Sequence, residues 1–166
     1  MALFDFFKKK KTQEKEPKRY PITPEMTDGV SFVYSLIKDQ FSLIEKSGVK
    51  TPPLLYKGDN GDYEINQWLA GYISGFYDAF LQSKNQKYDP NALELIFSVL
   101  YGEEVAEEGI KQCIVAMMTL GDKSDNLFKV AFDEFDDGLY AGGNNFFDWK
   151  DKKIFAPLGI YNKYAM

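Results

Sequence analysis

The spacing of apolar residues along the chain predicts a long first helix. Between positions 30 and 44 an apolar residue recurs every three or four positions, the period of a helix with one buried face. In front of this stretch, Thr23-Pro24-Glu25 combines an N-cap residue, a proline suited to the first helical position and an acid near the positive helix end. Gly48 offers a C-terminal stop. The apolar positions are Val30, Val33, Ile37, Phe41 and Ile44.

Residues 51–62 predict a loop, and two interpretations of its end remain open. Asn60-Gly61 could turn a short hairpin between 54–57 and 63–65, but Asp62 could equally cap a helix. We favour the helix, because the apolar residues that follow fit the helical template without a gap. These residues are Ile65, Trp68, Leu69, Tyr72, Ile73, Phe76 and Phe80.

Three further helices follow from caps and glycine stops. Asp89-Pro90 begins a short one that ends or bends at Gly102, and 103–120 forms the next. Asp122 or Ser124 caps a helix that runs to about Tyr140. The last 21 residues, 146–166, are aromatic and lysine-rich without a clear period. The apolar positions are Leu93, Ile96, Phe97 and Leu100 in the short helix and Leu127, Phe128, Ala131, Phe132, Phe135 and Leu139 in the last one.

Five helices, short connections and no convincing strand run predict an all-α fold, a single-domain bundle with an aromatic, irregular C-terminal segment. Gly71-x-x-x-Gly75 places small residues one turn apart, which lets another helix approach closely. Cys113 falls on an apolar helix face and is expected in the core. The aromatic residues of the C-terminal segment could fill the core or anchor an interface.

Charge divides the 166 residues into two parts. The net charge is −5, but residues 1–20 carry +4, which leaves −9 on residues 21–166. We expect a basic, mobile arm at 1–20 and an acidic helical domain at 21–166. The apolar residues of MALFDFF precede the lysines of KKKK, so residues 1–11 could lie on an anionic membrane, although a free arm is the commoner outcome. The −9 domain would repel nucleic acid.

The absence of histidine and the single cysteine restrict the chemistry. Without histidine the chain has no Ser-His-Asp or Cys-His mechanism, and it lacks the commonest transition-metal ligand. One cysteine excludes an internal disulfide, which is typical of a cytoplasmic protein. The longest stretch without a charge has 13 residues, too few to cross a bilayer. We therefore expect a cytoplasmic protein that needs no cofactor and holds no metal.

Two clusters of carboxylates are the sharpest candidates for a site. Glu104-x-x-Glu107 followed by Glu134-x-x-Asp137 resembles the signature of the all-α, MazG-like nucleoside triphosphate pyrophosphohydrolases. That resemblance implies four magnesium ligands and a magnesium-dependent enzyme. Laid out at 100° per residue, however, both helices turn most of these acids away from their apolar faces, so they would not converge inside the bundle.

We therefore favour a solvated acidic surface that binds a basic protein partner. Acids toward the end of a helix spanning about 124–140 would oppose the helix dipole, and a sequence that breaks a local rule without structural gain indicates function. In general character the chain is similar to bacterial immunity and antitoxin proteins, small acidic domains that neutralise basic toxins. We expect a non-catalytic binding module of this kind. The candidate partner-binding residues are Glu103, Glu104, Glu107, Glu108, Asp133, Glu134, Asp136 and Asp137.

Overall fold

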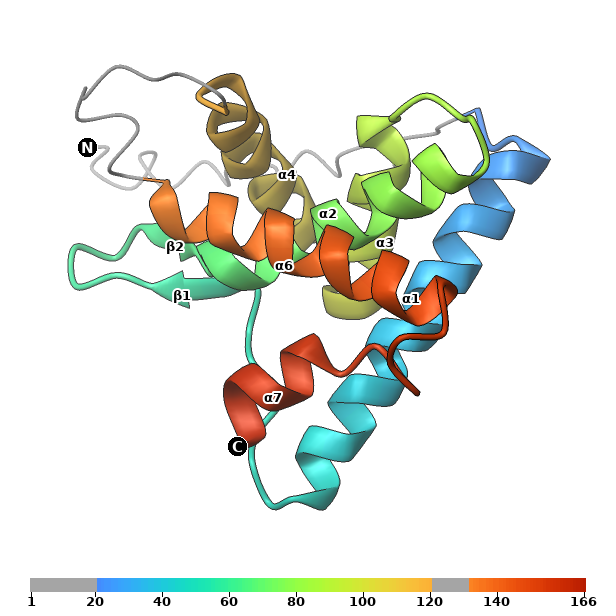
Figure 1. Ribbon diagram of the computed structural model, residues 1–166. Helices are drawn as coiled ribbons and strands as arrows, with labels where there is room; N and C mark the ends of the chain where they lie inside the picture. Colours follow the sequence, from blue (N-terminus) through green and yellow to red (C-terminus); the bar gives the residue numbers. More distant parts are fainter. Residues whose placement is uncertain (1–20, 121–131) are drawn as a thin grey trace, which may run out of the picture.

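The computed structural model describes residues 21–120 and 132–166, and this part of the chain forms six helices and one hairpin (Figure 1). The prediction of an all-α bundle is confirmed. The basic arm and the start of the helix expected from Asp122 or Ser124 lie outside the described residues. The elements are α1 (Pro24–Lys46), β1 (Leu55–Lys57), β2 (Tyr63–Ile65), α2 (Gln67–Ser83), α3 (Pro90–Tyr101), α4 (Glu103–Met118), α6 (Asp133–Lys150) and α7 (Gly159–Ala165).

The predicted caps define two helix starts. The Thr23 side chain accepts a hydrogen bond of 3.1 Å from the Met26 N–H and begins α1. Asp89 does the same for Asn91 at 2.9 Å and begins α3. In both cases a proline follows the cap, where its missing N–H costs no intrahelical hydrogen bond.

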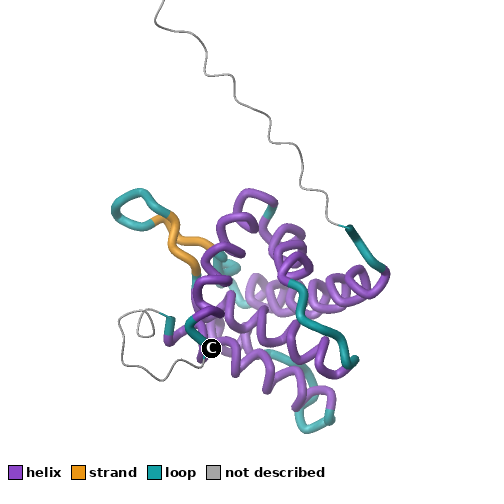
Figure 2. The backbone as a smooth tube through the Cα atoms, turned by 90° about the horizontal axis from the view of Figure 1, so that it is seen from above, coloured by secondary structure: helices purple, strands orange, loops and turns teal. Residues whose placement is uncertain are grey.

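The hairpin between residues 54 and 65 corrects the preference for a helix capped by Asp62. Leu55 pairs with Ile65 and Lys57 with Tyr63 in an antiparallel ladder, and Gly61 adopts the positive φ of 87° that the turn needs. The helix begins later, at α2, where the Asn66 side chain accepts from the Leu69 N–H. The predicted spacing of apolar residues does form a helix, but the turn residues before it belong to a hairpin. This hairpin projects from the helical body (Figure 2).

Helix α2 is the centre of the core, since 12 of its 17 residues are buried. A helix buried nearly all round must be covered on every side, and α1, α4 and above all α6 cover it. Helix α1 also packs against α3, which packs against α4. The expected burial of Cys113 is confirmed.

Helices α2 and α6 are parallel and unusually close. A Cβ on Gly71 would clash with the backbone of Phe135, and a Cβ on Gly75 with the backbone of Leu139. From the other side, Gly138 and Gly142 face the backbone of α2 in the same way. The predicted close approach at Gly71-x-x-x-Gly75 is therefore confirmed, and its partner is a second pair of glycines with the same spacing.

The extent of α6 corrects the prediction of a helix ending near Tyr140. The helix continues through Gly142-Gly143-Asn144-Asn145 to Lys150, so only 151–158 and the last residue, Met166, of the C-terminal segment lack regular structure. Glycine and asparagine are poor helix formers, and local propensity alone would stop the helix there. Packing of Gly142 against α2 offsets that preference, because the missing side chain is what permits the contact.

Helix α7 is held on the bundle by two side-chain amides, the buried Gln40 and the half-buried Asn145. Gln40 Oε1 accepts from the N–H groups of Ile160 at 2.8 Å and Tyr161 at 3.4 Å. Asn145 Oδ1 accepts from the Gly159 N–H at 3.0 Å and from the Tyr72 hydroxyl at 2.5 Å. These bonds satisfy donors at the start of α7, where the helix has no side-chain cap of its own.

The structure places some aromatic residues of the C-terminal segment in the core and leaves others exposed. Phe146 is buried in the core, and Trp149 is half-buried. Phe155 is fully exposed, at 101% of its reference area. No described helix is long and apolar enough to cross a membrane.

Candidate binding surfaces

The first surface lies at the start of α6 and contains half of the predicted acidic residues. Asp133, Glu134 and Asp137 are exposed, whereas Asp136 is half-buried. None of the three exposed acids forms an ion pair with a lysine in the described part of the chain.

The position of these acids in α6 corrects the argument that the helix dipole opposes them. The described helix begins at Asp133, and Asp133, Glu134 and Asp136 lie in its first turn. There the unpaired N–H groups make the helix end positive, so carboxylates stabilise it. The acids break no local rule, and their function has to be argued from their exposure and their neighbours.

Tyrosines accompany these acids. Asp133, Asp137 and Tyr140 recur at helical spacing on the side of α6 opposite the glycines that pack on α2, and Tyr140 is 65% exposed. Tyr56 of the hairpin is 46% exposed. Burial first, and then the negative charge of Glu134, raise the pKa of the Tyr56 hydroxyl. We call Asp133, Glu134, Asp137, Tyr140 and Tyr56 the acidic tyrosine face.

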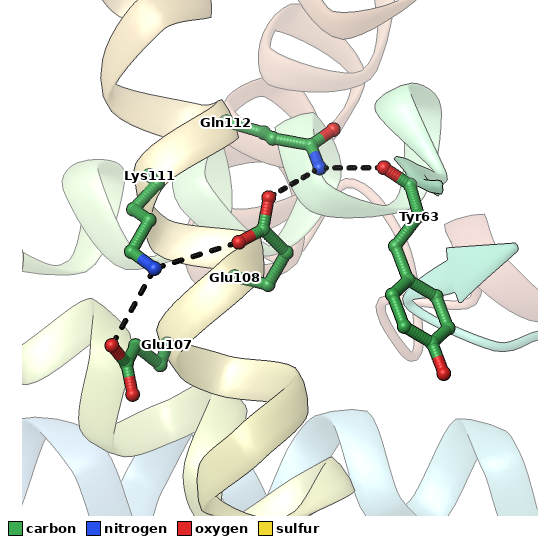
Figure 3. A network of polar contacts seen from close by, with 5 residues as sticks. All are labelled: Tyr63, Glu107, Glu108, Lys111 and Gln112. Atoms are coloured by element: carbon green, nitrogen blue, oxygen red, sulfur yellow. Dashed lines mark hydrogen bonds and ion pairs between the residues drawn. The ribbon is translucent and has the colours of Figure 1, made fainter. Parts of the chain in front are cut away.

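The second predicted cluster, on α4, has mainly structural roles. Glu103 and Glu104 are exposed in the first turn, where Gly102 provides no side-chain cap, so they complement the helix end. Glu107 and Glu108 form ion pairs of 3.4 and 3.5 Å with Lys111 (Figure 3).

Glu108 also supports a contact between α4 and the hairpin (Figure 3). It accepts a hydrogen bond of 3.0 Å from Gln112 Nε2, which donates to the Tyr63 carbonyl at the same distance. Gln112 Oε1 accepts from the Ile65 N–H at 2.9 Å. One glutamine side chain thus satisfies two backbone groups of β2, and Glu108 orients it.

The acids of the magnesium alternative are Glu104, Glu107, Glu134 and Asp137. Within residues 21–120 and 132–166, no group of three or more Asp, Glu or Cys residues is arranged to hold a metal ion. The geometry therefore offers this alternative no support.

Cys113 has no catalytic setting either. Its side chain is fully buried, and burial raises the pKa of the thiol to about 12. A thiol in this state stays protonated near neutral pH and is a poor nucleophile.

The third surface is a groove of about 670 Å³ that the sequence did not indicate. It lies where α1 begins and where α2 and α6 end. We call it the aromatic groove. Its aromatic lining is Phe32, Phe80, Phe146 and Trp149, and its charged lining is Glu25, Asp28, Lys84 and Lys150.

The rings of the aromatic groove form a connected stack. The centroid of the Phe32 ring lies 4.7 Å from that of Phe80 and 6.0 Å from that of Trp149. The Phe146 ring contacts all three of these rings. One signal could have indicated this site. Phe32 falls between the periodic positions Val30 and Val33, so a large apolar residue lies off the buried stripe of α1.

Comparisons of this chain with protein families, with curated proteins and with solved structures found no match.

Proposed function

We propose that this chain is a non-catalytic, cytoplasmic protein-binding module whose acidic tyrosine face binds a basic protein. The observation that carries the proposal is the exposed line of Asp133, Asp137 and Tyr140 on α6, next to the exposed Glu134. Exposed carboxylates steer a cationic partner, and neighbouring tyrosines supply the rigid apolar contact that concentrates binding energy. The binding needs no cofactor.

Inhibition of a basic toxin or enzyme, in the manner of immunity and antitoxin proteins, is the use that fits this face best. An acidic inhibitor blocks a basic active site by charge complementarity and needs no chemistry of its own. The acids of α4 are weaker candidates for contact with the partner, because Glu107 and Glu108 already pair with Lys111.

Matched charge-neutralising variants test the proposal. Glu134→Gln with Asp137→Asn removes two charges from the face, and Glu45→Gln with Asp39→Asn removes the same two chemical groups from exposed positions of α1. Affinity capture from the native cell's lysate, followed by calorimetry with the purified partner, compares the three proteins. A basic protein should bind the wild type and the α1 control alike, and should bind the face variant about tenfold or more weakly.

A partner that binds all three proteins equally would reject the acidic tyrosine face as its site. Tyr140→Ala separates contact from general charge, because it leaves the net charge unchanged. A loss of affinity in this variant, together with weaker binding at higher salt, supports a direct interface.

A further inference from the structure

We propose that the aromatic groove binds residues 3–7 of this same chain, Leu-Phe-Asp-Phe-Phe. This surface is separate from the acidic tyrosine face, because the groove lies at the end of α6 and the acids lie at its start. The inference therefore does not depend on the proposed function.

The composition of the segment fits the groove. Leu3, Phe4, Phe6 and Phe7 are four large apolar side chains, and the groove offers a connected stack of rings of which Phe32 and Trp149 remain half-exposed. Aromatic side chains that meet edge-to-face or offset gain contact energy beyond their buried area. A groove of about 670 Å³ has the capacity of an ordinary ligand site, which suits two or three such side chains.

The charges of the segment fit the lining as well. Asp5 lies between the phenylalanines, and the lysines Lys84 and Lys150 lie on the walls formed by the ends of α2 and α6. The lysine run 8–11 follows the phenylalanines, and the acids Glu25 and Asp28 lie on the wall formed by α1. Both signs of charge in the lining therefore have a counterpart in residues 3–11, the segment and the lysine run that follows it.

The length of the connecting chain permits the contact. Residues 1–20 lie outside the described residues, which begin at Pro21, four positions before the groove residue Glu25. A connection of 13 residues, 8–20, has a root-mean-square span of about 20 Å when flexible. The segment is thus held near the groove at an effective concentration of the order of millimolar, so weak intrinsic affinity suffices.

Fluorescence of Trp149 in the full chain tests the contact. The chain has two tryptophans, so a Trp68→Phe background leaves Trp149 as the reporter within the groove. In this background, a variant with Phe4, Phe6 and Phe7 replaced by Ser should show red-shifted emission and about twofold or greater acrylamide quenching. The matched control replaces the same three residues by Leu, which keeps the segment apolar and should retain the protection.

Equal quenching of the parent and the serine variant would overturn the proposal. Protection that increases with protein concentration would also overturn it, because the occupant would then come from a second copy. Protection that requires phosphatidylserine vesicles would overturn it in favour of a lipid surface.

A nitroxide label provides a second measurement that does not depend on tryptophan. Cys113 is fully buried, so a cysteine placed at the groove residue Ser83 can be labelled selectively in the folded chain. The label at 83 should broaden the amide resonances of residues 3–7, whereas a label at the exposed position Asp39 should not. The same broadening from both labels, or from neither, would contradict the proposed contact.

Discussion

Gly138 of α6 lies directly against the backbone carbonyl of Trp68 in α2, at a distance that leaves no room for a Cβ atom. Since Gly142 meets Tyr72 one turn further on, the two helix backbones are in contact along their shared length. This contact places α6 against α2, and the acidic tyrosine face and the aromatic groove lie at the two ends of α6.

Gly138→Ala should destabilise the fold by about 2 kcal/mol or more, because the added methyl group overlaps backbone that cannot move aside independently. Urea unfolding followed by circular dichroism measures the change. The matched control is Gly143→Ala in the same helix, where the added Cβ would lie 3.7 Å from the Gly75 carbonyl oxygen. That variant should be neutral or slightly more stable, because alanine favours the helix. Equal losses at the two positions would contradict the close packing.

Gln40→Leu should release α7 from the bundle. The side chain is 1% exposed and accepts from the N–H groups of Ile160 and Tyr161, so leucine leaves two donors without their acceptor. The expected loss is about 1–3 kcal/mol, with faster hydrogen exchange at these two amides. Gln82→Leu, at an exposed site on α2, should change neither quantity appreciably. Unchanged protection of Ile160 in Gln40→Leu would reject this role.

Gln112→Leu should loosen the hairpin from α4, because the amide satisfies both the Ile65 N–H and the Tyr63 carbonyl. We expect a loss of about 1–2 kcal/mol in unfolding free energy. Lys111→Ala is the neighbouring control, since the lysine is exposed to solvent and its ion pairs with Glu107 and Glu108 should contribute little. A larger loss in the lysine variant than in the glutamine variant would contradict this assignment.

Stability should fall as the pH rises above 9, and Cys113 should contribute to the fall. Burial raises the pKa of this thiol from 9.0 to about 12, so the folded chain keeps a proton that the unfolded chain loses. The contribution of this thiol to the free energy of unfolding is complete below pH 9 and is lost as the pH approaches 12. The slope near pH 10 should approach about 1.4 kcal/mol per pH unit for this group. Unfolding measured from pH 8 to 11 should show a shallower decline in Cys113→Ala, and an identical decline would contradict the assignment.

Tyr77 and Tyr164 should extend this loss to higher pH, because burial raises the pKa of each from 10.0 to about 12. Their contributions are therefore present below pH 10 and decline between pH 10 and 12. The absorbance of tyrosinate should consequently appear together with unfolding for these two residues.

Much of the arrangement of helices could be predicted from short sequence patterns. The caps at Thr23 and Asp89 and the small residues at Gly71 and Gly75 were predicted, because each acts through a geometry that neighbouring residues establish by themselves. Local signals supported both a hairpin and a helix at this point, because Asn60-Gly61 is a good turn and Asp62 is a good helix cap. The hairpin is stabilised by Gln112, which accepts a hydrogen bond from the Ile65 N–H although it lies 47 residues away in the sequence. No local sequence pattern predicts such a contact.

The acidic residues illustrate the same division. Their identity and clustering were evident from composition, but the sign of their interaction with the helix dipole depended on which end of α6 they occupy. The described helix starts at Asp133 rather than ending soon after it, which reverses the argument. The aromatic groove was missed because its lining comes from three helices and a loop that no sequence pattern places together.

The sequence by itself determined the helical class, the predicted caps, the buried thiol and the charge available at each surface, because these depend on residue type and on spacing within one turn. The tertiary structure decided the extent of α6, the use of the turn at Asn60-Gly61 and the assembly of the aromatic groove. Contacts between distant segments, above all the glycine faces of α2 and α6, outweigh local propensity there, since close backbone packing compensates for residues that would otherwise end a helix.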